Sequence, residues 1–330
     1  MFEDAEAASD AYFSTSTPPL DLSAALVRVT ALVERALASG TCVAFVTSGG
    51  TTVPLERNTV RFLDNFSTGV RGAACVEALL ARGYFVVCLR RTGSAAPFAR
   101  TLAGVSGGGS SRGSGIATGF DTRFLDALEI DKEGRIQLNG GAKVLAALTA
   151  YRAVVSKGSL EQVDFISASD YFWFLRAISC ALAPLKRNVM GLFAAAVSDF
   201  HVPPNSLAEH KLGSLLGSLG LTLDLSPTPK LLGVLRHKWA PALFAVSFKL
   251  ETDSAILESK ARGAVAAYGV HCVVANELTT RRDKVVLISG QADEPIETLE
   301  RLETTPEIEP MLIDALIQRH RLYHQNSEFL

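Results

Sequence analysis

The segment Arg61–Gly69 carries side chains that could hold an anion, and it lies just before a predicted helix. It supplies a guanidinium group, the carboxamide of Asn65, and the hydroxyl groups of Ser67 and Thr68. The N-terminus of a helix has unsatisfied N–H groups and a partial positive charge, so it suits a phosphate or a carboxylate. Arg71 falls in the first helical turn, where a cation weakens the helix unless it holds an anion. The alternative is that Arg71 is an ordinary solvated arginine.

A glycine-containing turn, Thr47–Thr51, follows the first predicted strand. Gly49 and Gly50 allow backbone N–H groups to face a bound anion, and the flanking hydroxyl groups add donors. A plain tight turn explains the same residues, so both interpretations stay open. The turn does not match the dinucleotide fingerprint Gly-x-Gly-x-x-Gly, and the chain has no Walker A motif.

Polar residues also close three later predicted strands. Asp199 follows the small residues Ala194–Ala196. Small residues let a flat ligand approach the backbone, and a carboxylate at a strand end suits Mg²⁺, a ribose or a ligand amide. Phe248 could line a base pocket and Lys249 could meet phosphates, while Asn276 could meet a base edge or a ribose. The alternative for Asp199 is a capping role in the turn that follows.

Three other features of the sequence bear on its chemistry. Lys211 could reach a triphosphate as a point charge, although a single lysine in a loop is more often a surface residue. Gly109–Gly113 matches the nucleophile elbow of serine hydrolases, but it lies in a Gly/Ser tract without the flanking strand and helix that an elbow requires. The six histidines show no metal-ligand spacing.

Composition narrows the class of protein. The chain has 330 residues, a formal net charge of −2 and 48% hydrophobic residues, which indicates an ordinary globular protein. Such a charge favours neither nucleic acid nor a membrane surface as a partner, and no apolar run is long enough to span a bilayer. The five cysteines form no disulfide or zinc pattern. With an N-terminus that lacks an apolar signal core, they indicate reduced thiols and a cytoplasmic location.

Strand and helix patterns alternate along the chain, which predicts an α/β fold with a Rossmann-like, doubly wound, mostly parallel sheet and helices on both faces. Residues 1–20 are expected to form a mobile arm, and residues 21–330 a single nucleotide-binding domain with a flexible Gly/Ser insertion near 104–119. A helix after Ser67 or Thr68 as its cap should carry Ala73, Val76 and Leu80 on one face. Further helices are expected at residues 22–37, 144–155, 171–182, 255–268 and 308–320. Strands are expected at residues 42–46, 84–89, 163–166, 191–197, 243–248, 270–275 and 285–288.

Taken together, these segments resemble the eukaryotic phosphopantothenoylcysteine synthetases, also called phosphopantothenate–cysteine ligases. Five pieces carry the resemblance in the right order: Val46–Thr51, Val60–Gly69, Ala194–Phe200, Glu209–Lys211 and Ser247–Asp253. Thr68 stands where the family often has serine, and the Gly/Ser tract looks like an insertion of this chain's own. The pair Phe248-Lys249 resembles the ATP-using eukaryotic branch rather than the CTP-using bacterial one.

The resemblance implies a homodimeric ligase of coenzyme A synthesis that uses ATP and Mg²⁺ to join 4'-phosphopantothenate to L-cysteine through an acyl-adenylate. Asn65 would hold the reacting carboxylate, Arg61 would assist it, and Lys211 would neutralise the triphosphate. Asp199 would also be the metal ligand. The nucleotide-binding residues would be Gly49, Gly50, Ser67, Gly69, Arg71, Ala195, Ala196, Asp199, Phe248, Lys249 and Asn276. The segment Thr52–Thr59 is a candidate loop for closing the site against water.

Two rival hypotheses use the same fold class. A nicotinamide-dependent oxidoreductase should have the dinucleotide fingerprint and an acidic residue about 20 positions later, and the first loop has neither in register. A non-catalytic binding protein that keeps the fold should have lost its polar site residues, yet Arg61, Asn65, Asp199 and Lys211 are all present.

Overall fold

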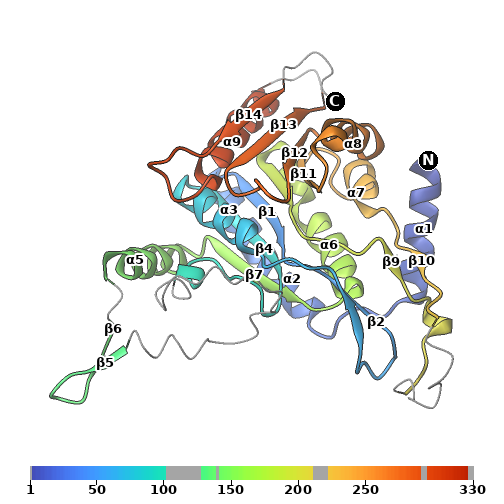
Figure 1. Cartoon of the computed structure of the whole chain (residues 1–330), viewed down its shortest axis with the longest axis horizontal. Coiled ribbons are helices and arrows are strands. Elements are labelled where there is room, and N and C mark those ends of the chain that lie inside the picture. The colour runs from blue at the N-terminus through green and yellow to red at the C-terminus, as the bar shows by residue number, and fades with distance from the viewer. Residues whose placement is uncertain (1, 102–127, 139–140, 211–221, 291–295, 326–330) are drawn as a thin grey trace.

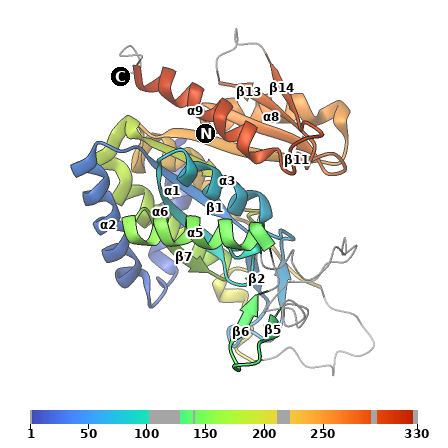
Figure 2. The ribbon, with the colours of Figure 1, turned by 90° about the vertical axis from the view of Figure 1, so that its left-hand side faces the viewer.

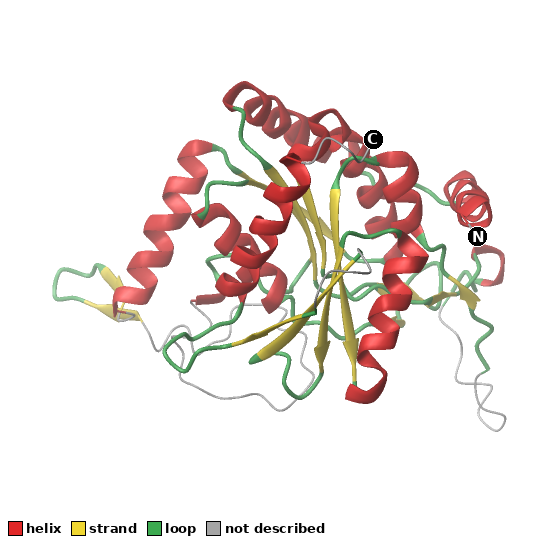
Figure 3. Cartoon of the chain, turned by 90° about the horizontal axis from the view of Figure 1, so that it is seen from above, coloured by secondary structure: helices red, strands yellow, loops and turns green. Residues whose placement is uncertain are grey.

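The computed structural model has an eight-stranded sheet at its centre with helices on both sides (Figures 1 and 3). It describes residues 2–101, 128–138, 141–210, 222–290 and 296–325. The sheet consists of β7 (Leu160–Phe165), β4 (Phe85–Arg91), β1 (Val43–Ser48), β8 (Val189–Phe193), β11 (Phe244–Glu251), β12 (Cys272–Glu277), β13 (Lys284–Ser289) and β14 (Glu297–Glu300), in that spatial order.

The first six of these strands are parallel, and their order is that of the Rossmann fold, so the predicted fold class is confirmed. The last two, β13 and β14, are antiparallel and extend the sheet at one edge. β13 was predicted, but β14 was not. In its four residues the half-buried Glu297 and Leu299 alternate with the exposed Thr298 and Glu300, a pattern too short and too polar to detect.

Alternate side chains of the central strands enter two separate cores. In β1, Val43 and Phe45 pack on one face, and Ala44 and Val46 on the other. The first face is covered by α2 (Leu22–Ser39), α6 (Ala168–Leu182), α7 (Leu231–Val234) with the short π-helix η5 (Leu235–Trp239), and α8 (Ser254–Tyr268). The second face is covered by α3 (Val70–Ala81) and α9 (Glu309–Gln325).

The N-terminal helix α1 (Phe2–Thr15) packs on the first face, so the prediction of a mobile arm was wrong over these residues. Phe13 is buried, and its ring lies edge-on to Trp173 and Trp239. Tyr12 contacts Phe172 in the same way. The small and acidic residues of this segment give little sign of a helix, because its stability comes from these tertiary contacts.

The remaining elements are short or peripheral. The helix α5 (Gly141–Lys157) lies beside the sheet. The hairpin of β5 (Leu128–Ile130) and β6 (Ile136–Leu138) projects away from it, as Figures 1 and 2 show. The other elements are β2 (Thr52–Pro54), β3 (Phe62–Asp64), η2 (Ala183–Asn188), β9 (Phe200–His201), η3 (Pro204–Ser206) and β10 (Ser226–Pro227). The Gly/Ser tract at 104–119, with its chance nucleophile-elbow match, lies outside the described residues.

Two details differ from the predictions and bear on the site. The N-cap of α3 is Gly69, in a left-handed conformation and without a side-chain cap, rather than Ser67 or Thr68. β8 ends at Phe193, four residues before the predicted end. The N-cap of α8 is Asp253, whose side chain accepts a hydrogen bond from the Ala255 N–H.

Candidate active site

The turn after β1 and the segment after β8 lie side by side at the carboxyl edge of the sheet. The Ala196 N–H donates to the Gly49 carbonyl at 2.8 Å, and the Thr51 N–H donates to the Ala196 carbonyl at 3.0 Å. This is the point where the strand order reverses, and open α/β sheets bind ligands at such a point. Two of the predicted motifs therefore meet where the fold places a ligand.

Close packing explains the two glycines of this turn. Gly49 has φ +87°, and a Cβ there would lie 2.6 Å from the Cβ of Arg91. A Cβ on Gly50 would lie 1.7 Å from the backbone carbonyl oxygen of Asn65. The glycines let two neighbouring segments approach the turn. Neither glycine lines either of the two cavities described below, so their contacts with phosphate remain a prediction.

An ion pair and a backbone hydrogen bond hold the loop that carries Asn65. Asp64 forms an ion pair with Arg91 at the end of β4. The Asn65 N–H donates to the Thr51 carbonyl at 3.1 Å, and the Thr51 hydroxyl accepts from the Ser198 N–H at 3.0 Å. Thr51 thus links Asn65 to the residue next to Asp199, and the two predicted site residues lie in one region.

A small cavity of about 230 Å³ opens at the N-terminus of α3. No side chain caps this helix, so its first N–H groups remain available to an anion. The cavity contains seven of the predicted site residues: Ser67, Gly69, Arg71, Ala195, Ala196, Phe248 and Asn276.

Three arginines make the small cavity cationic. Arg71 is joined by Arg281 and Arg282, which follow β12 and were not predicted as site residues. Arg71 lies 3.3 Å from the Glu309 carboxylate and donates to the Arg281 carbonyl. Burial, with the positive charges of Arg282 and Arg71, lowers the pKa of Arg281. Burial raises the pKa of Glu309, although Arg71 opposes that shift. Among the described residues, Glu309 is the one carboxylate that lines this cavity, against three arginines.

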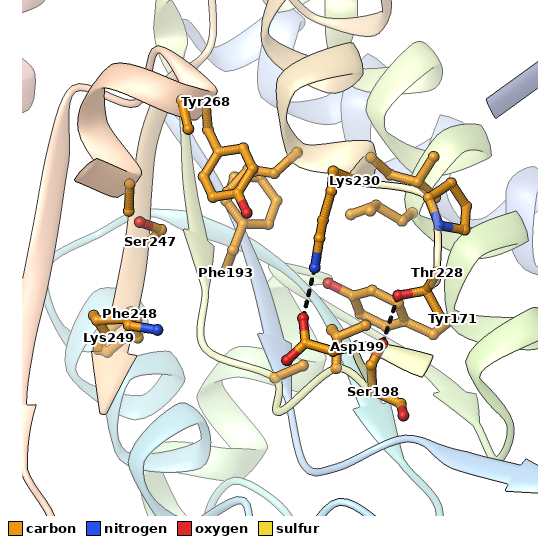
Figure 4. A pocket seen from close by; sticks show the side chains of 18 of the residues that line it. Tyr171, Phe193, Ser198, Asp199, Thr228, Lys230, Ser247, Phe248, Lys249 and Tyr268 are labelled. Carbon is orange, nitrogen blue, oxygen red and sulfur yellow. Dashed lines mark hydrogen bonds and ion pairs between the residues drawn. The ribbon is translucent and has the colours of Figure 1, made fainter. Parts of the chain in front are cut away.

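A larger cavity of about 530 Å³ lies on the other side of the β8 and β11 strand ends (Figure 4). Its walls include the rings of Tyr171, Phe193, Phe248 and Tyr268. Its charged lining consists of one carboxylate, Asp199, and three lysines: Lys230, Lys249 and Lys260. An aromatic cavity with a surplus of positive charge suits a ligand that has an apolar part and a phosphate.

Lys230 and Asp199 are paired across this cavity. The Lys230 ammonium lies 2.6 Å from the Asp199 carboxylate, as Figure 4 shows. The Thr228 hydroxyl donates to the Ser198 carbonyl at 2.7 Å, and the Thr228 N–H donates to the Asp199 carbonyl at 2.9 Å. These two bonds join the segment after β8 to the segment before α7.

Arg61 lies apart from both cavities, on the hairpin formed by β2 and β3. Its backbone N–H and its guanidinium group face Glu56, whose side chain is 0% exposed. The hairpin also contacts the segment before Lys211, since the Arg57 and Asn58 N–H groups donate to the Ala208 and Glu209 carbonyls. Lys211 itself lies outside the described residues. The proposed closing segment Thr52–Thr59 forms the first half of this hairpin, and its closure remains a prediction.

The nucleotide-binding residues were predicted to surround one ligand, whereas nine of the eleven are divided between two cavities that share Ala195 and Phe248, and Gly49 and Gly50 line neither. Arg281, Arg282, Lys230 and Lys260 were not predicted. Arg281 and Arg282 are adjacent and follow a strand end five residues after Asn276, which is a usable signal. Lys230 and Lys260 stand alone in their segments, and nothing local distinguishes them.

The cysteines fit no chemical role in this site. All five are free, and Cys75, Cys88 and Cys272 are buried, whereas Cys180 is exposed. Burial raises the pKa of Cys75 and of Cys88 to about 12, so these thiols are unreactive at neutral pH. Within the described ranges, no His, Cys, Asp or Glu side chains gather in threes as a metal centre would require. The same part of the chain contains no helix with the length and apolar character of a membrane span.

Comparison with known proteins agrees with the resemblance. The family model described as "DNA/pantothenate metabolism flavoprotein C-terminal domain" matches residues 141–310. A rice protein named phosphopantothenate–cysteine ligase 2 is 40% identical over 277 residues, covering 83% of this chain and 79% of its own. The human phosphopantothenate–cysteine ligase is 41% identical over 287 residues, covering 87% of this chain and 88% of its own.

A solved structure has the same fold along nearly the whole chain. It is a Cab2 mutant in complex with phosphopantothenate-cysteine, with a TM-score of 0.83 and 33% identity, covering 96% of this chain and 98% of the other. Relatives this similar over most of their length, with the predicted motifs in place, leave one conclusion. The chain belongs to the phosphopantothenate–cysteine ligase family.

Proposed function

We propose that this chain joins 4'-phosphopantothenate to L-cysteine in coenzyme A synthesis, using ATP and passing through an acyl-adenylate. The observation that carries the proposal is the meeting of two unlike cavities at Ala195 and Phe248, beside the loop of Asn65. One cavity is small and cationic, and the other is large and aromatic. A ligase that activates a phosphorylated acid with a nucleotide needs two such neighbouring sites.

The sizes and linings of the cavities favour a division of the substrates. The small cavity, with a helix N-terminus, three arginines, Phe248 and Asn276, suits the phosphates and the base of the nucleotide. The large cavity, with Asp199 and three lysines in its charged lining, suits the phosphorylated acid. In this division Ser67, Gly69, Arg71, Phe248 and Asn276 bind the nucleotide, and Ala195 lies where the two substrates meet.

The reaction then takes place where the cavities meet. The phosphopantothenate carboxylate attacks the α-phosphorus of ATP and pyrophosphate leaves. The cysteine amine attacks the resulting mixed anhydride and AMP leaves. No side chain needs to form a covalent bond, so the protein acts by positioning the reactants and stabilising charge. The Asn65 amide is the donor proposed for the reacting carboxylate and the acyl-phosphate oxygens.

Magnesium fits this arrangement as part of the nucleotide complex. Mg²⁺ is usually bound by one or two carboxylates together with substrate phosphates and water. Asp199 is the one carboxylate lining the large cavity, so it is the protein ligand that we propose. When bound, the ion would neutralise charge on the phosphates. The triphosphate would be held by the helix N-terminus at Gly69, by Arg71 and by Lys249, with Lys211 as a further positive charge.

We further propose that the enzyme is a cytoplasmic homodimer. One face of α5 exposes Leu145, Leu148, Tyr151 and Val155, and such an apolar stripe suits burial against a second copy of the chain. Sedimentation as a monomer at micromolar concentration would contradict the dimer. Isolation of the protein with disulfides from a secreted fraction would contradict the cytoplasmic location.

The direct test of the ligase activity is pyrophosphate release by the purified protein. We expect release with phosphopantothenate, Mg²⁺ and ATP, faster than with CTP, and we expect AMP and the phosphopantothenoylcysteine product once cysteine is added. Omitting phosphopantothenate is the matched control. If neither nucleotide is consumed under any combination, the ligase proposal fails.

Changing Arg71 to alanine tests the division between the cavities. Loss of one charged hydrogen bond to a phosphate typically costs about 1.5–3 kcal/mol, so the variant should bind ATP at least about tenfold more weakly. Affinity for phosphopantothenate should stay within about twofold. Isothermal titration of each ligand alone measures both. A loss confined to phosphopantothenate would place the phosphorylated acid in the small cavity instead.

A further inference from the structure

We propose that Arg282, in the turn after β12, binds the phosphates of the nucleotide in the small cavity. The inference rests on the proposed function, which places ATP in that cavity. It adds a binding residue to that proposal, because Arg282 lies in none of the five motifs that carry the family resemblance.

Arg282 differs from the other charged side chains of the small cavity in having no partner. Four charged side chains line the cavity: Arg71, Arg281, Arg282 and Glu309. Arg71 lies 3.3 Å from the Glu309 carboxylate, and the Arg281 guanidinium donates to the Leu278 carbonyl at 2.5 Å. Within the part of the chain that the structure describes, Arg282 has neither a hydrogen bond nor an ion pair. Its guanidinium is therefore the group in this cavity that is left to a ligand.

The three arginines are close enough to repel one another. Burial and the positive charges of Arg282 and Arg71 lower the pKa of Arg281. Glu309 balances one of the three charges, which leaves a surplus of two positive charges in the lining. The uncapped N-terminus of α3 adds partial positive charge to the same space. A ligand with several negative charges, such as a nucleotide polyphosphate, relieves this repulsion.

Both neighbours of Arg282 in the chain are anchored. The Arg281 carbonyl accepts a hydrogen bond from Arg71. Asp283 is paired with Arg301 at 2.7 Å, and its carbonyl accepts from the Arg301 N–H at 2.6 Å. The backbone of Arg282 is thus held in place, whereas its side chain is exposed. Such an arrangement lowers the entropy that is lost when the guanidinium binds an anion.

The alternative is an ordinary solvated arginine on the surface of a turn. The position of Arg282 argues against it, because the same cavity contains Arg71 and the N–H groups at the start of α3. A guanidinium presents two parallel N–H donors, a geometry that matches two oxygens of a phosphate. Arg282 therefore supplies phosphate donors on the side of the cavity formed by the β12 turn.

The test compares Arg282→Met with Arg282→Lys and with the matched control Arg321→Met. Arg321 is also an exposed arginine without an ion pair among the described residues, but it lies on α9 outside both cavities. We would titrate each protein with a non-hydrolysable ATP analogue in Mg²⁺, with adenosine, and with phosphopantothenate. Thermal unfolding with and without inorganic pyrophosphate gives a second readout.

Arg282→Met should bind the ATP analogue at least about tenfold more weakly, because a charged hydrogen bond to a phosphate is lost. Its affinities for adenosine and for phosphopantothenate should stay within about twofold of wild type. Arg282→Lys keeps the charge without the planar fork, so its loss should be smaller than that of Arg282→Met. Arg321→Met should match the wild type.

The unfolding temperatures separate binding from a structural role. Without ligand, Arg282→Met should unfold no earlier than the wild type, since the substitution removes a like charge and breaks no bond. Pyrophosphate should stabilise the wild type more than Arg282→Met, because a ligand stabilises a protein in proportion to its affinity for the folded state.

Unchanged binding of the ATP analogue by Arg282→Met would overturn the role of Arg282. An equal loss for adenosine, or a loss confined to phosphopantothenate, would overturn it as well, because neither result comes from a contact with nucleotide phosphates. Failure of the wild-type protein to bind the analogue would instead overturn the proposed function.

Discussion

Changing Asn65 to alanine is expected to slow formation of the acyl-adenylate at least about a hundredfold, a typical loss when one preorganised donor to developing charge is removed. The backbone of Asn65 is held by the Asp64–Arg91 ion pair and by the bond to Thr51, so the substitution removes the amide without releasing the loop. Binding of ATP should be unchanged, because Asn65 lines neither cavity. Single-turnover measurement of pyrophosphate release in the absence of cysteine isolates this step.

Two further variants make the Asn65 experiment specific. Asn65→Asp keeps the shape but adds a negative charge next to the substrate carboxylate, so it should be at least as slow as alanine. Asn188→Ala removes an amide that accepts a bond from His324 and lines neither cavity, so it should turn over at the wild-type rate. A near wild-type rate for Asn65→Ala would show that the donor has been misassigned.

Acidification from pH 7 to pH 5 is expected to lower the free energy of unfolding by about 4 kcal/mol. Burial lowers the pKa of His271 to about 3 and that of His320 to about 4. The unfolded chain, with histidine pKa values near 6.5, therefore binds more protons than the folded chain in this range. The stabilisation is complete above about pH 6.5 and is lost as the pH falls toward the folded pKa values.

Hydrogen bonds explain why both rings must be neutral. His271 accepts at Nδ1 from the Ala245 N–H at 2.9 Å, and a proton on that nitrogen would break the bond. His320 has the Arg187 carbonyl 2.8 Å from Nε2, so Nε2 carries the proton, and Nδ1 accepts from the Tyr84 hydroxyl at 2.8 Å. A second proton would charge a ring packed among Phe244 and Tyr84.

Urea unfolding at pH 7 and at pH 5 checks this prediction. His320→Gln should remove roughly half of the difference between the two pH values, because one of the two buried rings is gone. His237→Gln, which changes an exposed histidine, should leave the difference as it is in the wild type. Equal stability of the wild-type protein at both pH values would contradict the assignment.

The central strands could be predicted because both of their faces are buried. Val43–Val46 and Phe85–Leu89 are continuous apolar runs, and such runs are typical of a parallel sheet covered by helices. β8 was predicted too long, since Ala194–Val197 are apolar like the strand but lie beyond its end, where Ala196 bonds to Gly49 and Thr51. Local composition cannot distinguish apolar residues inside a strand from apolar residues in the segment that follows it.

The candidate site was predictable as far as parallel strands bring their carboxyl ends to one edge. Asp199 follows β8, and Phe248 and Asn276 lie near the carboxyl ends of the neighbouring strands β11 and β12. The order of the strands follows from the fold class. The division into two cavities was not predictable, because it depends on the face of the sheet toward which each loop folds. For the same reason Lys230 and Arg281, which come from separate loops, could not be matched to their cavities.

The helix α1 can pack in its native position only after much of the later chain has been synthesised. Its aromatic residues contact Phe172, Trp173 and Trp239, so its partners are made more than 150 residues later. At about 5–20 residues per second, a ribosome takes on the order of ten to forty seconds to make that stretch. During this time Tyr12 and Phe13 have no native partners, and a helix of 14 residues is only marginally stable alone. The first helix to be synthesised is therefore among the last to pack against the sheet. Until it does, the rings of Tyr12 and Phe13 remain exposed to solvent and accessible to chaperones.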